Sequence, residues 1–390
     1  MPLYDKPFEP AEEVSVFRRY LRNCRVLGCC FVAPLFGDRQ SVQPLRVRRW
    51  SRYTLYSFTC LFLMWQLVVR AAARYIARGT LDSSAYAVVT VLYLAQGSVC
   101  FATMLLFPQT LVTLDALYVS LESRFPLPEE SRRRLSHLYG SVVLLQAVEA
   151  AEQNVQRAVR YFSATSSGLE VVHAAFDLIG ALVTFSWSYI PQNGVAVATW
   201  LATAYITEMD GRLRKIATPH LHGASSRDAN GTLGELKRDL RIVRRALAAT
   251  QEAFQAGLLM TYVACVTRLC IAVYYAITVQ FHALSGYSYI LYIFYVVTHF
   301  TIISKGAESL VGQVNKLKRT LSSSEYDRTL QSSEKKALQA FLLSLDPERY
   351  RLSMAGLFEL RLSSLAKVAG AVLTYTVILI QTNISFAAKC

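Results

Sequence analysis

The stretch Ser83–Leu114, SSAYAVVTVLYLAQGSVCFATMLLFPQTLVTL, contains no Asp, Glu, Lys or Arg. A helix needs about 20 apolar residues to cross the hydrocarbon core of a bilayer, so this run predicts a membrane span. Similar runs recur along the chain. They are Tyr53–Val69, Leu178–Thr207, Ala253–Ser304 with the single charge Arg268, and Val368–Ala388. The sequence therefore predicts an all-α integral membrane protein.

The overall composition supports this prediction. Hydrophobic residues make up 53% of the chain and charged residues only 17%, which is unlike a disordered chain or an ordinary soluble enzyme. The net charge of +14 raises the question of a nucleic-acid partner. The charges, however, are crowded between the apolar runs instead of covering a folded soluble surface, so no nucleic acid is expected.

The apolar runs predict seven spans. The run Ala253–Ser304 counts as two, divided at Leu284–Gly286. The third span is the weakest, because Leu138–Val148 is short and is followed at once by Glu149 and Glu152. We include it because, without it, the basic loops on its two sides would lie on opposite faces of the membrane.

The distribution of Lys and Arg predicts the orientation. With seven spans and a cytoplasmic N-terminus, most of the 41 basic residues fall in inner segments, as the positive-inside rule expects. The C-terminus is then extracellular. The predicted organisation is a cytoplasmic N-terminal segment 1–52, spans one to four in 53–207, a cytoplasmic loop and helical extension 208–252, spans five and six in 253–304, a cytoplasmic segment 305–365 and span seven in 366–388.

Two cytoplasmic stretches have apolar residues at helical spacing. Leu233–Gln255 predicts a helical extension of span five, and Glu334–Leu345 predicts a separate amphipathic helix. Two interpretations remain open. The helices either lie on anionic lipid at the membrane surface or form a cytoplasmic bundle in which subunits meet.

The last span contains Thr374-Tyr375-Thr376-Val377-Ile378-Leu379-Ile380-Gln381. This motif resembles that of the insect gustatory receptor family, which has Thr-Tyr, five mainly apolar residues and then Gln-Phe. The preceding stretches Gly356–Leu360 and Gly370–Leu373 also look like that family. One departure is Thr382, which stands where the family usually has Phe.

The resemblance implies a fold and a function. Members of the family, and the related insect odorant receptors, are implied to be tetrameric ligand-gated cation channels of the plasma membrane. Span seven would line the pore, the cytoplasmic ends of spans four to seven would form an anchor, and a small-molecule tastant would bind among the outer helices. A homotetramer or a hetero-oligomer with related receptors, permeating cations, membrane lipid and a chemosensory neuron are expected on the same ground.

Helical spacing suggests which residues face the pore. Thr374, Ile378, Gln381 and Ser385 share one face of span seven, and Tyr375 belongs to the same motif. A ring of Gln381 amides offers donors and acceptors to a hydrated ion, and Ile378 can form a constriction that dewets. The other interpretation is that Gln381 only hydrogen-bonds a neighbouring helix.

Polar residues of the outer half are candidates for the ligand pocket. The buried charges Glu149 and Arg268 are predicted at similar depth, where they either bind ligand or pair to fix helix packing. His173 and Asp177, four residues apart, share a face or form a pair at the outer surface. The predicted pocket residues are Tyr93, Gln96, Glu149, His173, Asp177, Arg268 and Tyr275.

Other functional classes have less support. The sequence has no nucleophile elbow, phosphate loop or zinc signature, so neither an enzyme nor a cofactor is expected. No third ligand accompanies His173 and Asp177, so no metal is expected. An odorant-receptor-type subunit that needs a co-receptor remains an alternative, as does a non-channel receptor or transporter. A transporter is disfavoured because Pro191 is taken as the only proline inside a span.

Overall fold

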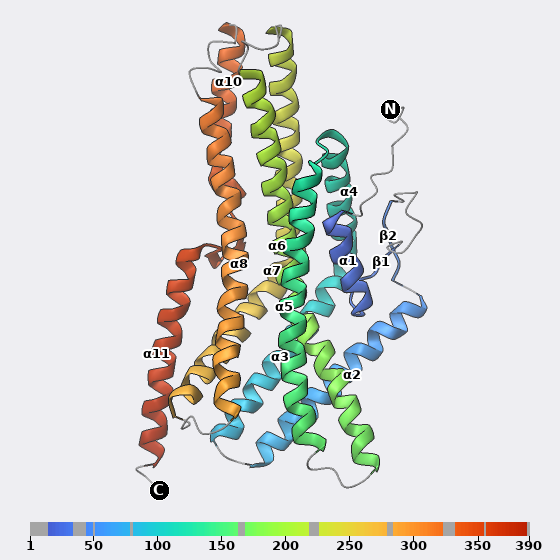
Figure 1. Ribbon diagram of the computed structural model, residues 1–390, viewed down its shortest axis with the longest axis vertical. Coiled ribbons are helices and arrows are strands. Elements are labelled where there is room, and N and C mark those ends of the chain that lie inside the picture. The colour runs from blue at the N-terminus through green and yellow to red at the C-terminus, as the bar shows by residue number, and fades with distance from the viewer. Residues whose placement is uncertain are drawn as a thin grey trace.

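The computed structural model of the chain is an elongated bundle of helices (Figure 1). It describes residues 15–33, 44–49, 51–78, 81–162, 168–217, 226–278, 284–322, 332–354 and 356–387. The elements in chain order are α1 (Val16–Val26), β1 (Val32–Ala33), β2 (Arg46–Val47), α2 (Arg52–Arg78), α3 (Leu81–Leu106), α4 (Pro108–Arg124), α5 (Glu129–Phe162), α6 (Gly168–Ala217), α7 (Ser226–Thr278), α8 (Leu284–Leu321), α10 (Ser332–Ser344), the 3₁₀ helix η2 (Pro347–Tyr350), β3 (Ser353–Met354), β4 (Phe358–Glu359) and α11 (Leu362–Ala387).

The predicted helical character is confirmed, and the four strands form only two short antiparallel pairs, β1–β2 and β3–β4. Among the described residues, α2, α3, α6 and α7 contain stretches long and apolar enough to cross a membrane. Many large apolar side chains on α2, including Phe62 and Trp65, are exposed. An exposed apolar face of this kind suits contact with lipid or with another subunit.

Three helices are much longer than a bilayer is thick. Helix α7 has 53 residues, which corresponds to a length of about 80 Å, against about 30 Å for the hydrocarbon core. Helices α6, α7 and α8 are therefore longer than a membrane span requires, and α10 lies beside them at one end of the molecule (Figure 1). Leu233–Gln255 lies inside α7, and α10 nearly coincides with Glu334–Leu345, so both predicted cytoplasmic helices are confirmed as helices.

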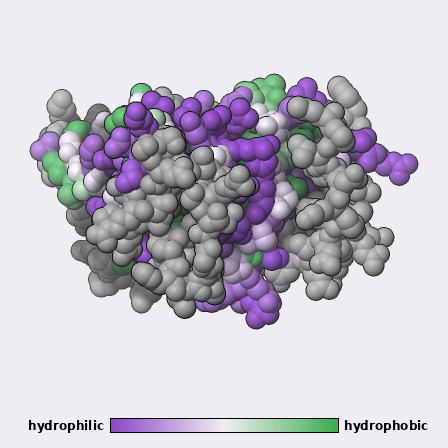
Figure 2. All heavy atoms as spheres, turned by 90° about the horizontal axis from the view of Figure 1, so that it is seen from above, coloured by the Kyte–Doolittle hydropathy of each residue, from purple (hydrophilic) through white to green (hydrophobic). Residues whose placement is uncertain are grey.

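The end of the molecule that carries α10 has a polar surface. Seen from that end, most of the described side chains are hydrophilic, and the hydrophobic ones form small patches (Figure 2). Polar side chains favour contact with water, so this end is suited to lie outside the membrane.

Two predicted boundaries are wrong. The apolar run Ser83–Leu114 is not one span: α3 ends at Leu106, and Pro108 is the first residue of α4. Proline is favoured at that position because its missing N–H has no helical partner there. Pro108 thus lies outside α3, and Pro191 is the proline that lies inside a long apolar helix. The run Ala253–Ser304 is divided into α7 and α8, as predicted, but Leu284–Gly286 lies in the first turn of α8 instead of between the two helices.

Glycines bring α6 and α7 into close contact. A Cβ added at Gly194 of α6 would lie 2.6 Å from the ring of Phe254, and one at Gly257 of α7 would lie 2.6 Å from Pro191. Both distances are too short for a real contact, so only glycine permits this crossing. Pro191 thus lies inside α6 and packs against a glycine of the neighbouring helix.

Buried ion pairs connect the shorter helices to the bundle. Arg18 of α1 makes two hydrogen bonds to Asp115 of α4, at 2.9 and 2.7 Å. Arg124 of α4 binds Asp239 of α7 at 2.9 Å. The Tyr20 hydroxyl of α1 donates to the carbonyl oxygen of Ile190, in the turn before Pro191. These contacts dock α1 and α4 beside the long helices.

The cysteines of the N-terminal segment are buried thiols. Cys24, Cys29 and Cys30 are each at most 1% exposed, and all three are free. Burial raises the pKa of the Cys30 thiol to about 12, because the thiolate would be poorly solvated there. This cysteine is therefore protonated and unreactive at neutral pH.

The α6–α7 crossing leads to a first prediction. Gly194→Ala should destabilise the protein by about 1–3 kcal/mol, because the new methyl group overlaps the buried Phe254 ring. Thermal unfolding of the detergent-purified chain measures this. Gly211→Ala is the matched control on the same helix: nothing lies within 4 Å of its added Cβ, so the unfolding temperature should be unchanged or higher. Equal effects of the two substitutions would contradict the prediction.

Candidate functional site

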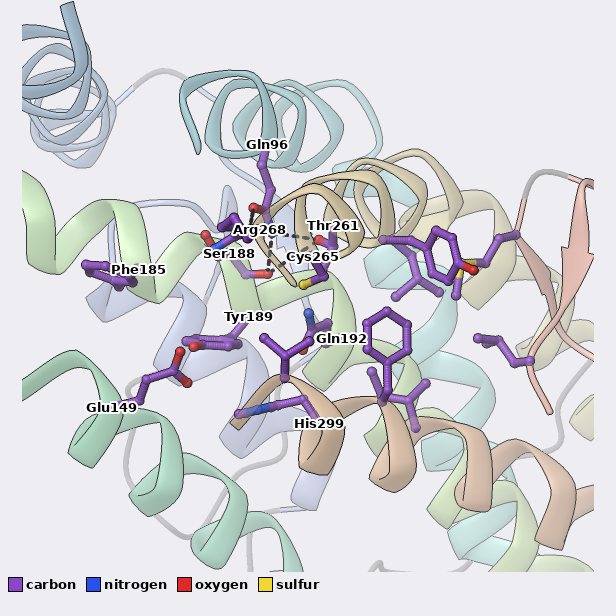
Figure 3. A pocket seen from close by; sticks show the side chains of 17 residues that line it. Gln96, Glu149, Phe185, Ser188, Tyr189, Gln192, Thr261, Cys265, Arg268 and His299 are labelled. Atoms are coloured by element: carbon purple, nitrogen blue, oxygen red, sulfur yellow. Dashed lines mark hydrogen bonds between the residues drawn. The ribbon is translucent and has the colours of Figure 1, made fainter. Parts of the chain in front are cut away.

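A narrow cavity lies between α3, α5, α6, α7 and α8 (Figure 3). It leaves about 20 Å³ for the centre of a water molecule, which is room for about one water. One part of the wall is apolar and includes Leu258, Val296, Phe300 and Ile303. The polar residues of the wall are Gln96, Glu149, Ser188, Tyr189, Gln192, Thr261, Tyr262, Cys265, Arg268 and His299.

Arg268 of α7 is a buried cation with several neutral partners. Its guanidinium donates to Gln96 Oε1 at 2.8 Å and to the Ala264 carbonyl at 3.0 Å. The guanidinium carbon also lies 3.9 Å from the centroid of the Tyr93 ring. The side chain is thus held by an amide, a backbone carbonyl and an aromatic face, all of which stabilise a cation.

Gln96 links three helices. Its Oε1 accepts from Arg268 of α7, and its Nε2 donates to the Ser188 carbonyl of α6 at 3.1 Å and to Thr261 Oγ1 at 2.8 Å. Ser188 lies in the turn before Pro191, whose missing N–H and bulky ring disturb the helical hydrogen bonds of that turn. A side-chain donor from another helix is a common way to satisfy carbonyls near such a proline.

Three buried acceptor atoms on the cavity wall have no hydrogen-bond partner among the described residues. They are Glu149 Oε2 of α5, Gln192 Oε1 of α6 and Nε2 of His299 in α8. The three residues are 2%, 5% and 5% exposed, so bulk water does not solvate them. Unpartnered acceptors carry a free-energy cost, which makes this wall suited to a hydrogen-bond donor.

The orientation of His299 is determined by two contacts. Its Nδ1 lies 2.7 Å from the Tyr295 carbonyl, and its ring stacks on Tyr189 with centroids 4.8 Å apart. A carbonyl only accepts, so Nδ1 carries the proton in this contact. In the neutral ring, Nε2 is then the acceptor that remains.

The structure brings together three of the seven predicted pocket residues at the cavity wall, namely Gln96, Glu149 and Arg268. Tyr93 lies behind Arg268 and also contacts Phe185. Arg268 contacts Gln96, Tyr93 and the Ala264 carbonyl.

The remaining predicted pocket residues lie elsewhere. Asp177 binds Arg70 of α2 at 2.6 Å, so it has a partner on another helix and is no part of the cavity wall. The side chains of His173 and Tyr275 lie outside the described residues.

The sequence analysis did not include Gln192 and His299 among the pocket residues. Both are uncharged residues in helices that are otherwise largely apolar, whereas the prediction relied mainly on charged residues and on tyrosines. A signal was present, because a polar side chain inside an apolar helix is costly unless it has a function or a partner.

Helix α11 lies at the edge of the bundle and packs on α7 and α8 (Figure 1). Its buried face is a strip of residues four apart: Val368, Val372 and Thr376 are 5%, 7% and 2% exposed. Thr374 and Gln381 are exposed, as are Tyr375 (58%) and Ile378 (48%). The side chain of Ser385 lies outside the described residues.

One apolar cluster joins the cavity to α11. It contains Cys265, Val296 and Phe300, which line the cavity, together with Val368 and Val372 of α11. The same side chains therefore form the cavity wall on one side and the support of α11 on the other.

A comparison with known protein families identifies the family of this chain. The model of the 7tm chemosensory receptor family matches residues 17–386. The chain belongs to this chemosensory receptor family. Its members are receptors rather than enzymes, and the match extends from α1 to the end of α11. A comparison with curated proteins finds no match.

Solved structures show the same fold. The chemosensory receptor is similar to the insect olfactory receptor OR5 from Machilis hrabei, with a TM-score of 0.75 and 14% identity over 94% of this chain and 98% of that one. The structure of OR5 in complex with eugenol matches with a TM-score of 0.74, 13% identity and the same coverage. At this identity the likeness concerns the fold.

The Gln96–Arg268 contact leads to a second prediction. Gln96→Leu should destabilise the receptor by roughly 1.5–3 kcal/mol, because the buried guanidinium loses a hydrogen bond. Thermal unfolding again measures the effect. The double variant Gln96→Leu/Arg268→Met removes the cation as well and should recover part of the loss.

An exposed glutamine provides the control for this experiment. Gln109→Leu on α4 makes the same chemical change at an exposed position and should leave the unfolding temperature within about 1 °C of that of the wild type. Strictly additive losses in the Gln96 and Arg268 double variant would show that the two side chains are not coupled.

Proposed function

We propose that this chemosensory receptor is a gustatory receptor of the plasma membrane that acts as a tastant-gated, non-selective cation channel. Four copies of the chain form the channel, and α11 of each copy lines the pore. The spans are α2, α3, α5, α6, α7, α8 and α11, with the N-terminus cytoplasmic and the C-terminus extracellular. The extended ends of α6, α7 and α8, with α10, form the cytoplasmic anchor.

The division of α11 into two faces carries this proposal. Its strip Val368–Val372–Thr376 packs against the rest of the chain, whereas Gln381 and Thr374 point away from that strip and are exposed. An amide exposed on a membrane-spanning helix is costly against lipid and is favoured beside water or another subunit. A pore axis surrounded by four copies of α11 provides that environment.

The connection between cavity and α11 supports ligand gating. The cavity holds about one water, so a larger ligand must push its walls apart. Phe300 and Val296 line the cavity and belong to the same apolar cluster as Val372 of α11, so we expect a displacement of the wall to reach α11. A ligand that binds the widened form more tightly shifts the population toward that form, which we assign to the open pore.

Recordings from cells that express this chain alone test the proposal. A cation current evoked by an agonist, without added G protein, supports a homomeric channel. Current that appears only with a second receptor subunit would indicate a hetero-oligomer with a co-receptor. Absence of current in both conditions would contradict the channel function.

A third prediction concerns the position of Gln381. In Gln381→Cys, a charged thiol reagent added from outside should change the agonist-evoked current severalfold within minutes, because the modified side chain lies in the ion path. Leu373→Cys is the matched control, since Leu373 is 61% exposed but lies away from the Thr374–Ile378–Gln381 face. Equal sensitivity of the two variants would contradict the assignment of that face to the pore.

A fourth prediction concerns Ile378. Ile378→Ala should raise the current in the absence of agonist, because a smaller side chain weakens an apolar constriction that excludes water. Leak current at fixed voltage, normalised to surface expression, measures this. Leu373→Ala removes a comparable aliphatic side chain outside the pore face and should leave the leak unchanged.

A further inference from the structure

The side of this cavity formed by α5, α6 and α8 carries three acceptor atoms that have no hydrogen-bond partner among the described residues. Glu149, Gln192 and His299 come from three different helices, each at least 95% buried. The unpartnered atom of each is an acceptor: a carboxyl oxygen, an amide oxygen and the Nε2 of an imidazole whose Nδ1 faces the Tyr295 carbonyl. Figure 3 shows all three beside the ring of Tyr189.

On α3 and α7, by contrast, the polar side chains Gln96, Thr261 and Arg268 already donate hydrogen bonds to nearby acceptors. Gln96 Nε2 donates to the Ser188 carbonyl and to Thr261, and the hydroxyl of Thr261 donates to the Gly257 carbonyl at 2.8 Å. Arg268 donates to Gln96 and to a carbonyl of its own helix. The polar atoms of this wall therefore satisfy one another, whereas the acceptors across the cavity do not.

The rest of the cavity is apolar. Its apolar lining includes Leu258, Val296, Phe300, Ile303 and Met354 of β3. An occupant of the whole site thus meets acceptors at one end and hydrocarbon along its body.

We propose that this cavity selects a small amphiphilic ligand that carries at least two hydrogen-bond donors, as hydroxyl or amino groups, on a compact apolar body. The donors bind the acceptor atoms of Glu149, Gln192 and His299. The apolar body lies against Phe300 and Val296, the side chains that contact α11. This assignment of the ligand class rests on the proposed function, because it places the agonist in the cavity that is linked to the pore helix.

The chemistry distinguishes this class from purely apolar ligands. An apolar molecule would leave the three acceptors buried without partners, so it gains nothing at that end of the site. A molecule with donors replaces those unsatisfied contacts with hydrogen bonds. The donor group of the ligand can be neutral or cationic, because an acidic and a basic residue, Glu149 and Arg268, both line the cavity.

Binding can be tested without recording current. Thermal unfolding of the purified full-length receptor is measured with a panel of small diols and amino alcohols. Each diol is paired with its dimethyl ether, and each amino alcohol with the quaternary ammonium ether of the same skeleton. Members with donors should raise the unfolding temperature in a saturable way, and their methylated analogues should not. The diol and amino-alcohol arms then show whether the preferred donor is neutral or cationic.

Two variants and a matched control connect the binding to the cavity. Gln192→Leu and His299→Phe should each weaken the binding of a stabilising compound about tenfold or more. Gln146→Leu removes another amide of the same region, but Gln146 and Asn193 hydrogen-bond each other at 2.8 Å. That control should lower the stability of the ligand-free receptor and preserve the affinity. Gln192→Leu should leave the stability of the ligand-free receptor unchanged or increase it.

The outcomes separate this inference from the channel function. If methylated analogues stabilise the receptor equally, if no donor-bearing compound stabilises it, or if Gln192→Leu and His299→Phe bind like the wild type, the inferred ligand class is wrong. If binding follows the predicted pattern while cells expressing the chain show no current, the ligand class stands and the channel function fails.

Discussion

The burial of one arginine organises the membrane half of this receptor. Arg268 lies inside an apolar bundle, where an unpaired cation is costly, and Gln96 and Tyr93 of α3 help to stabilise it there. Gln96 in turn reaches the Ser188 carbonyl beside Pro191. The need to stabilise one charge thus aligns α3, α6 and α7, and the cavity opens beside the residues that do so.

The close crossing of α6 and α7 has a complementary effect. Gly194 and Gly257 let the two backbones approach beside Pro191 and Phe254, so the polar residues around Gln96 are held against a rigid contact. Glycine at these positions is favourable in a membrane helix pair, where close packing replaces the hydrophobic driving force. The hydrogen bonds around Gln96 and the glycine contact thus lie on the same pair of helices, whereas Glu149, Gln192 and His299 of α5, α6 and α8 each keep an unpartnered acceptor atom.

The apolar runs and the charges between them predict most of the helices, because span length and charge asymmetry are properties of the chain itself. The boundaries at Pro108 and Leu284 depend on local preferences that hydropathy ignores: a proline favours the first turn of a helix, and a Ser-Gly pair is tolerated inside one. Gln96, Glu149 and Arg268 stand out as polar residues in apolar helices. The partners of Asp177 and His299, however, come from other helices, and a single sequence does not specify those contacts.

The narrow strip by which α11 contacts its own chain has a mechanical consequence. Among the α11 side chains that the structure describes, the buried ones are Val368, Val372 and Thr376, which are spaced by four residues and form one line along the helix. Such a line resists sliding along the helix axis more strongly than it resists rolling about it. Side chains three residues apart on an α-helix, such as Ile378 and Gln381, differ in direction by about 60°. If α11 rotates about its axis by that angle, the Gln381 amide comes to face the direction that the Ile378 side chain faced before. The helix is neither lengthened nor broken by this rotation.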